Sequence, residues 1–198
     1  MTVNLSSRRP SAVAFAVAYC IVSHEFPAFA QRKFLIFGDK NIKYKAFKDP
    51  SGRFELEYPT KDWSPLPTGG SAVAILARND RTATVVIDVS RLTEPLAPSE
   101  VDTNAQIEVE TLKEQQPRAK DFSSEIVDAS AGRASLIRYA RIGANGPERI
   151  IRYSVGVGHE LYRLDAVVQE AALAKHESVI LHMIKSFKSP ADPPGAKN

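Results

Sequence analysis

Turns too short to hold a crossover connect most of the strand-like segments of this sequence. These segments alternate apolar and polar residues or are rich in β-branched ones, and they cover residues 53–58, 71–77, 82–89, 124–129, 134–142, 149–155 and 161–168. Asn79-Asp80, the glycine-containing run 143–147 and Val157-Gly158 separate neighbouring segments. Parallel strands need connections of about a dozen residues or more, so these neighbours should pair antiparallel.

Two stretches have the period of a helix instead. Residues 99–116 begin at Ser99, the expected N-cap with Asp102 as its capping-box partner, and end before Pro117. Residues 170–187 form the second helix. Each carries one apolar stripe, which comprises Val101, Ala105, Val109 and Leu112 in the first and Leu173, Ile180, Ile184 and Phe187 in the second. The expected fold class is therefore α+β, with an antiparallel sheet of about six strands flanked by helices.

The first 30 residues have the three parts of a cleavable export signal. Arg8 and Arg9 supply positive charge, residues 11–22 are apolar, and an Ala-Phe-Ala motif at 28–30 forms a cleavage site before Gln31. The apolar run is shorter than the roughly 20 residues that span a bilayer. The alternative is an N-terminal core helix. We expect a periplasmic or extracellular protein, and the export route, Sec or twin-arginine, stays open.

The chain divides into four parts on this interpretation. Residues 1–30 are the cleavable signal peptide, 31–45 a loosely docked lead-in, 46–188 one domain, and 189–198 a disordered tail with three prolines and no apolar period. Cleavage also removes Cys20, the single cysteine. The mature chain is therefore neither a thiol enzyme nor a holder of a cysteine zinc site.

Three short motifs resemble those of the PsbP-like family. They are Phe54-x-x-x-Tyr58-Pro59-x-x-x-Trp63, Leu161-Tyr162-x-Leu164 and Ile184-Lys185-Ser186-Phe187. The resemblance covers about residues 46–189 and implies an αβα sandwich. The best-known members are extrinsic lumenal proteins of photosystem II, so it also implies a non-catalytic accessory role outside a membrane. At the matching positions it implies packing roles, with Trp63 at a sheet edge and Phe187 beneath the last helix.

The patterns typical of catalytic and metal sites are missing from the sequence. The mature histidines are His159, His176 and His182, and the last two are six residues apart, on different sides of a helix. His176 falls in the apolar stripe, which favours a packing role at the edge of the core. The paired carboxylates Glu108 and Glu110 are expected on a solvated face. With no Gly-x-Ser-x-Gly elbow and no calcium loop, we predict no catalytic residue, no metal site and no cofactor.

One cross-strand pair points to docking. If Val157-Gly158 is a two-residue turn, Arg152 lies directly opposite Arg163. Like charges in this position are unfavourable, so the pair predicts a counter-charge. That charge is either internal, from Asp165 or a helix carboxylate, or external, on an acidic partner. Arg152 and Arg163 are therefore the candidate residues for partner docking.

The net charge and the hydropathy of the chain bear on whether it could bind nucleic acid or span a membrane. The leader takes two arginines and one glutamate from a net charge of +3, which leaves a nearly balanced mature chain and argues against nucleic-acid binding. No second apolar run is long enough for a transmembrane segment. We favour a non-catalytic exported accessory protein that docks on an unidentified protein partner, membrane-associated complexes included. The alternative is an extracytoplasmic module that binds a small ligand or a calcium-type ion, and a hydrolase ranks third. A pocket with convergent polar groups would favour the module, and a flat exposed patch would favour docking.

Cleavage of the leader is directly testable. The mature protein should begin at Gln31, because Ala28 and Ala30 supply the small residues that a signal peptidase needs. N-terminal sequencing of protein from the periplasmic fraction checks this, and an intact Met1 terminus in that fraction would contradict it.

Overall fold

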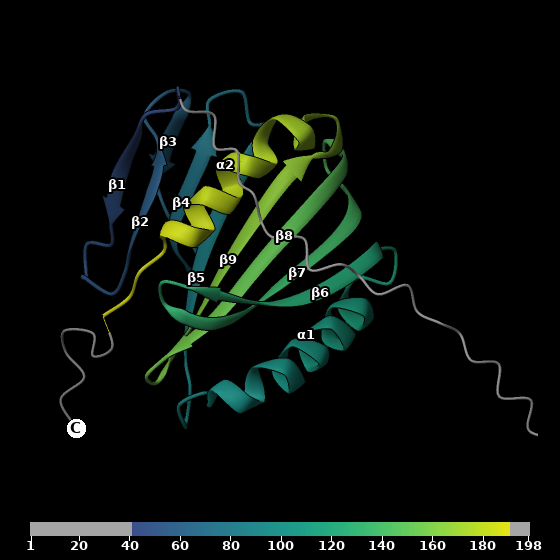
Figure 1. Ribbon diagram of the computed structural model, residues 1–198. Helices are drawn as coiled ribbons and strands as arrows, with labels where there is room; N and C mark the ends of the chain where they lie inside the picture. The colour runs from purple at the N-terminus through teal and green to yellow at the C-terminus, as the bar shows by residue number, and fades with distance from the viewer. Residues whose placement is uncertain (1–40, 191–198) are drawn as a thin grey trace, which may run out of the picture. The chain divides into compact units, whose positions relative to one another are not determined.

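The computed structural model describes residues 41–190. The predicted signal peptide lies outside this part, as do residues 31–40 of the predicted lead-in and residues 191–198 of the predicted tail. The elements of the described part are drawn in Figure 1. In chain order they are β1 (Tyr44–Lys48), β2 (Glu55–Pro59), β3 (Trp63–Leu66), β4 (Ala72–Arg78), β5 (Ala83–Arg91), the 3₁₀ turn η1 (Pro98–Glu100), α1 (Val101–Gln115), β6 (Lys120–Ala129), β7 (Gly132–Gly143), β8 (Gly146–Val157), β9 (Glu160–Gln169), the 3₁₀ turn η2 (Glu170–Ala172) and α2 (Leu173–Ser186).

The strands pair antiparallel throughout, as the short turns predict. The main sheet has seven strands in the order β3-β4-β5-β9-β8-β7-β6, and β1 and β2 form a separate two-stranded sheet. The predicted α+β class is confirmed, with seven strands in the main sheet where about six were expected.

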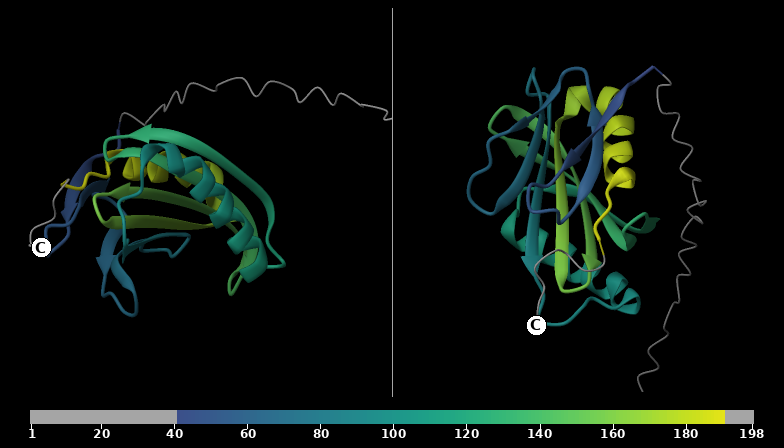
Figure 2. Two further views of the ribbon diagram at one scale, coloured as in Figure 1. Left: turned by 90° about the horizontal axis from the view of Figure 1, so that it is seen from below. Right: turned by 90° about the vertical axis from the view of Figure 1, so that its left-hand side faces the viewer.

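Alternate residues of the central strands face two different layers. Leu136 and Ile151 join the core beneath α2, whereas Ile137 and Ile150 join the core beneath α1. Because successive side chains of a strand point to opposite faces, the apolar runs of β7 and β8 can bury both. The two helices therefore lie on opposite sides of the sheet and form an αβα sandwich (Figure 1, Figure 2).

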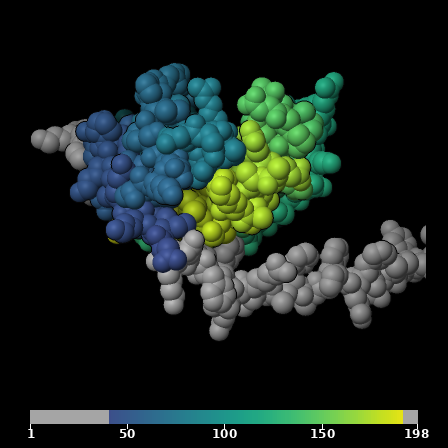
Figure 3. Space-filling model, turned by 90° about the horizontal axis from the view of Figure 1, so that it is seen from above, coloured from purple at the N-terminus to yellow at the C-terminus, as the bar shows by residue number. Residues whose placement is uncertain are grey.

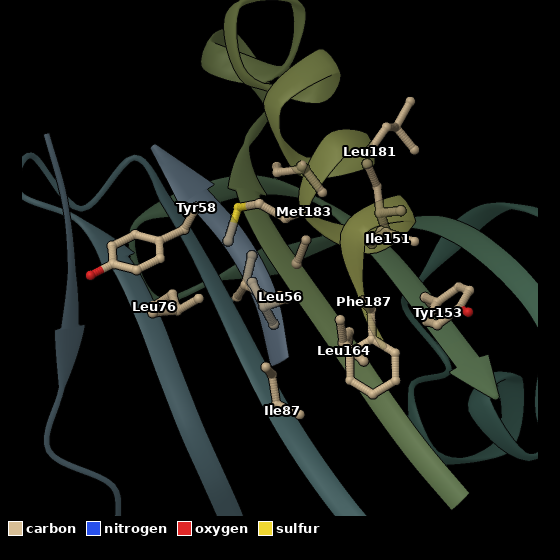
Figure 4. Close-up of a cluster of buried hydrophobic side chains, with 14 of the residues drawn as sticks. Leu56, Tyr58, Leu76, Ile87, Ile151, Tyr153, Leu164, Leu181, Met183 and Phe187 are labelled. Carbon is tan, nitrogen blue, oxygen red and sulfur yellow. The ribbon is translucent and has the colours of Figure 1, made fainter. Parts of the chain in front are cut away.

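The face under α2 is closed by α2 and β2 together. Leu56 and Tyr58 of β2 pack into the same core as Ile180 of α2. Phe187, directly after α2, is fully buried and stacks on Phe54 with ring centroids 5.6 Å apart, which confirms its predicted place beneath the helix. Figure 4 shows Leu56 and Phe187 pointing into this core, and Figure 3 shows α2 lodged at the surface between the N-terminal strands and β6–β8.

α1 buries its predicted stripe but begins later than predicted. Its buried residues are Val101, Ala105 and Leu112. The N-cap is Glu100 and not Ser99, because η1 occupies the residues before the helix. The Glu100 carboxylate accepts the Ala97 N–H at 3.0 Å. Asp102 serves no capping box and instead pairs with Arg133 of β7 at 2.8 Å.

Part of the segment expected to be a loosely docked lead-in is a strand. The interpretation of residues 31–45 as loosely docked is wrong at its end, because Tyr44 and Lys45 belong to β1 and pair with β2. The Tyr44 ring also stacks on His182 of α2, with centroids 3.9 Å apart. Trp63 begins the edge strand β3, which agrees with the sheet-edge position that the family resemblance implies. Pro65 fits there because an edge strand leaves some N–H positions unpaired.

His176 has the predicted packing role. It is 2% exposed, and its Nε2 lies 3.2 Å from Thr82 Oγ1. The Thr82 hydroxyl proton is already donated to Asp80 at 2.7 Å, so His176 Nε2–H is the donor in this contact. Burial, reinforced by the charge of Arg78, lowers the pKa of His176.

This lowered pKa predicts a specific pH dependence. Below about pH 6.5 the unfolded chain protonates His176 while the folded protein resists, so the stability that the neutral residue contributes is lost as pH falls. We expect His176→Gln to be less stable than the wild type at pH 8, with the difference shrinking toward pH 5. Urea unfolding at several pH values measures it. The matched control is His159→Gln at the exposed β8–β9 turn, and a pH-dependent difference for this control would contradict the assignment.

Two fully buried tyrosines should respond oppositely to loss of their hydroxyls. Tyr153 Oη has no hydrogen-bond partner within residues 41–190, whereas Tyr162 Oη donates to the Glu160 carboxylate and lies 3.1 Å from Ser189 Oγ. Removing an unpaired buried hydroxyl relieves its desolvation, so Tyr153→Phe should leave the free energy of unfolding unchanged or raise it by up to about 1 kcal/mol. Tyr162→Phe should lower it by about 1–2 kcal/mol. Equal losses in thermal or urea unfolding would disprove the distinction.

Candidate functional site

α1 covers only part of its face of the sheet. It packs on β6 and β7, and between it and strands β5, β8 and β9 lies a groove with a volume of about 490 Å³. We name this cavity the α1 groove. Its walls mix aliphatic side chains with charged and hydroxyl groups, among them Asp88, Ser90, Glu108, Arg152, Arg163 and Asp165.

The candidate docking residues lie in this groove, but they do not oppose each other. The turn between β8 and β9 is Gly158-His159, one residue later than predicted, and Gly158 has the positive φ of 56° that suits glycine. The predicted register is therefore wrong by two residues. Arg152 lies opposite Asp165, and Arg163 lies opposite Ser154. A shift of two preserves the faces, which is why both arginines still point into the groove.

Glu108 of α1 connects the helix to this sheet face. Its carboxylate accepts from Arg152 Nη1 at 3.2 Å, from Arg163 Nε at 3.2 Å and from Ser154 Oγ at 3.0 Å. Its side chain is only 16% exposed. A half-buried carboxylate with three donors is well satisfied, so Glu108 fixes the helix over β8 and β9.

Arg152 has an internal counter-charge. Its Nε and Nη2 donate to the two carboxylate oxygens of Asp165, both at 2.6 Å, in addition to the bond to Glu108. Burial alone would lower the pKa of Arg152, but the hydrogen bonds and charge of Asp165, helped by Glu108, outweigh burial and raise it. This arginine is charged, rigid and fully engaged within the fold.

Arg163 and Asp88 are less fully engaged. The side chain of Arg163 is 34% exposed, its Nη1 reaches Ser90 Oγ at 3.4 Å, and its Nη2 has no polar partner within residues 41–190. Asp88 lies directly opposite Arg163 in the β5–β9 pairing, yet the two form no ion pair. Instead the Asp88 carboxylate accepts the hydroxyl of Ser71, the residue directly before β4, at 2.9 Å. Arg163 and Asp88 can therefore each make a further hydrogen bond or ion pair in the groove.

The end of the groove near η1 is apolar. Leu92 and Leu96 follow β5, and Leu161 of β9 lies in the same wall. Leu96 packs so closely on Gly156 that a Cβ added there would lie 2.8 Å from Leu96 Cβ, so glycine is required at this position. Ile107 of α1 lines the groove and is 59% exposed.

The histidines lie elsewhere. His159 is exposed in the β8–β9 turn, and His182 contacts Glu57 at 2.8 Å. Among the described residues, no three histidine, cysteine or acidic side chains are grouped as a metal site would need.

Residues 41–190 also contain no helix long and apolar enough to span a membrane. A smaller cavity of about 290 Å³, beside β1 and β3, includes Trp63 and Arg78 in its lining.

The sequence interpretation missed that Glu108 is half-buried between α1 and the sheet. Glu110 is exposed and pairs with Lys113, as expected of a solvated face, but Glu108 is not. The spacing contained the signal, since Glu108 follows Ala105 by three residues and precedes Leu112 by four, and so belongs to the apolar stripe. A charged residue on a buried stripe indicates a partner in the layer beneath.

Comparison with known proteins finds similarity in structure only. No protein-family model matches the chain, and no curated protein matches it significantly. A solved structure of cyanobacterial PsbP (CyanoP) from Synechocystis sp. PCC 6803 is similar with a TM-score of 0.59 and 12% identity, over 77% of this chain and 96% of that one. LpqN of Mycobacterium tuberculosis, described as involved in cell envelope biogenesis, has a TM-score of 0.54 and 15% identity, over 77% and 94%. The Ran-binding protein Mog1p of Saccharomyces cerevisiae has a TM-score of 0.51 and 12% identity, over 74% and 95%.

These matches cover almost the whole length of each similar protein. They share the antiparallel sheet with helices that the strand order and the two cores of this chain establish. The family resemblance seen in the Tyr-Pro…Trp and Ile-Lys-Ser-Phe motifs is thus confirmed at the level of structure: the chain has the PsbP-like fold.

Proposed function

We propose that this protein is an exported, non-catalytic binding protein that takes a small ligand in the α1 groove. The observation that carries the proposal is the groove itself, whose volume of about 490 Å³ falls in the range of ligand sites. Polar groups of β5, β8, β9 and α1 converge in it beside an apolar wall. This is the feature that favours a ligand-binding module over docking through a flat patch.

Binding without catalysis fits the groups in the groove. The hydroxyls of Ser71 and Ser154 each donate to a carboxylate, of Asp88 and Glu108 respectively, and the described residues that line the groove include no histidine. One similar protein points the same way, since Mog1p is a Ran-binding protein. Export rests on the predicted leader at residues 1–30, and LpqN, a protein of similar fold, is described as involved in cell envelope biogenesis.

Docking on a protein partner is the second candidate, and Ile107 favours it. This side chain is 59% exposed at the groove, close in the helix to Glu108, so a partner could cover it. Of the two arginines proposed for docking, Arg163 would contact the partner directly. Arg152 would act by holding Glu108 and Asp165 in place.

Filling the groove tests the proposal. ¹⁵N-labelled protein is titrated with periplasmic extract of the host, separated into a low-molecular-weight filtrate and a protein fraction. We expect the filtrate to shift amide resonances around Ser90, Glu108 and Arg163, and Ser90→Phe to abolish these shifts by occupying the cavity. Ser123→Phe on the exposed edge strand β6 is the matched control and should respond like the wild type. Shifts with the protein fraction alone would favour docking instead, and no shift in the groove would contradict both.

A further inference from the structure

The charged side chains of the α1 groove indicate which chemical class of ligand it would bind. Its titratable groups are two cations, Arg152 and Arg163, and three anions, Asp88, Glu108 and Asp165. Arg152 and Asp165 neutralise each other through two hydrogen bonds of 2.6 Å. Glu108 is shared by both arginines. The Asp88 carboxylate is therefore the charge without an ionic partner among the described residues.

A simple anion does not suit this groove. It could bind Arg163, whose Nη2 is unpaired within the described residues, but it would then lie beside Asp88 and Glu108 in a site with one excess negative charge. A simple cation would suit Asp88 and leave Arg163 with a single good bond, to Glu108. A ligand with both charges satisfies both side chains.

The placement of Asp88 and Arg163 sets the spacing of those charges. The two residues are direct cross-strand partners, so their Cβ atoms lie about 4.5–5.5 Å apart. Their charged ends diverge, one toward Ser71, directly before β4, and the other toward Glu108 of α1. A gap that begins at this Cβ separation and widens toward the charged ends leaves room for a short zwitterion, whose carboxylate and ammonium are a few bonds apart and each add one hydrogen bond, the carboxylate accepting from the guanidinium edge.

The rest of the ligand should be apolar. The aliphatic wall of Leu92, Leu96 and Leu161 continues from the charged groups and is held by the close packing of Leu96 on Gly156. We infer that the α1 groove binds a free α-amino acid with an apolar side chain, its carboxylate on Arg163, its ammonium on Asp88 and its side chain against these leucines. This inference rests on the proposed function and narrows it to one ligand class.

Isothermal titration calorimetry of the exported protein tests the inference with defined probes. L-Leucine, L-valine and L-phenylalanine are compared with L-leucinamide, which lacks the carboxylate, and N-acetyl-L-leucine, which lacks the ammonium. We expect at least one of the amino acids to bind, and each derivative of leucine to bind at least tenfold more weakly than leucine itself. Failure of all three amino acids would overturn the inference.

Two variants assign the charges to their side chains. Asp88→Asn should weaken the binding of leucine at least tenfold. It should leave the affinity for N-acetyl-L-leucine unchanged, because this derivative lacks the ammonium that Asp88 would contact. Arg163→Gln should likewise weaken the binding of leucine and leave the affinity for L-leucinamide, which lacks the carboxylate, unchanged. Asp102→Asn, in the exposed pair with Arg133, is the matched control and should bind leucine normally. If a variant and the corresponding derivative weaken binding independently, the assignment is wrong.

The experiments distinguish loss of folding from loss of binding, and failure of the amino-acid inference from failure of the proposed ligand-binding function. Asp88→Asn keeps the shape of the side chain and an acceptor for Ser71, and thermal melting verifies that each variant is folded. If groove resonances respond to the periplasmic filtrate while all three amino acids fail to bind, the amino-acid assignment falls and the ligand-binding function stands. If the groove does not respond at all, both fall.

Discussion

The register between β8 and β9 determines which side chains α1 covers. Because Val157 pairs with Glu160, Arg152 meets Asp165 directly and Arg163 comes within reach of Glu108. These contacts lie between the helix and the sheet, where charges are costly unless they are paired. Removing one member of such a pair leaves the other charge without a partner. Because Arg152 and Arg163 are partly exposed, solvent screens that charge, and the cost is below the roughly 3–5 kcal/mol of a fully buried pair. The position of α1 is thus tied to a single cross-strand alignment.

Much of the fold could be predicted from local pattern, whereas contacts between distant segments could not. The alternation in β7, β8 and β9 and the stripes of both helices predicted the layers. The register failed because Val157, Gly158 and His159 allow two positions for a two-residue turn, and the backbone of Gly158 decides between them. A turn displaced by one residue changes the partner of every side chain but not its face. The arginines were therefore expected on the correct face with the wrong neighbours.

Local pattern also explains what was missed at the N-terminal side. β1 contains two lysines and no fully buried residue, so it has little apolar periodicity to detect. Its place depends on pairing with β2 and on the stacking of Tyr44 on His182, which is far away in the sequence. The start of α1 was misplaced because Ser99 is a good N-cap in isolation, but Pro98 begins a 3₁₀ turn that delays the helix.

The two faces of the sheet are closed unequally, and this difference locates the site. On one face α2 and β2 bury a continuous aromatic and aliphatic core around Phe187. On the other face α1 alone covers β6 and β7, so strands β5 and β9 face the groove. Because the groove is partly open to solvent, Asp88, Ser90 and Arg163 on these strands do not pay the full cost of desolvation. These groups stand on the central strands of a seven-stranded sheet, not on loops, and their positions are therefore fixed before any ligand arrives. A site whose charged groups stand on paired strands should select by the spacing of charges, because the strand ladder holds these groups in place.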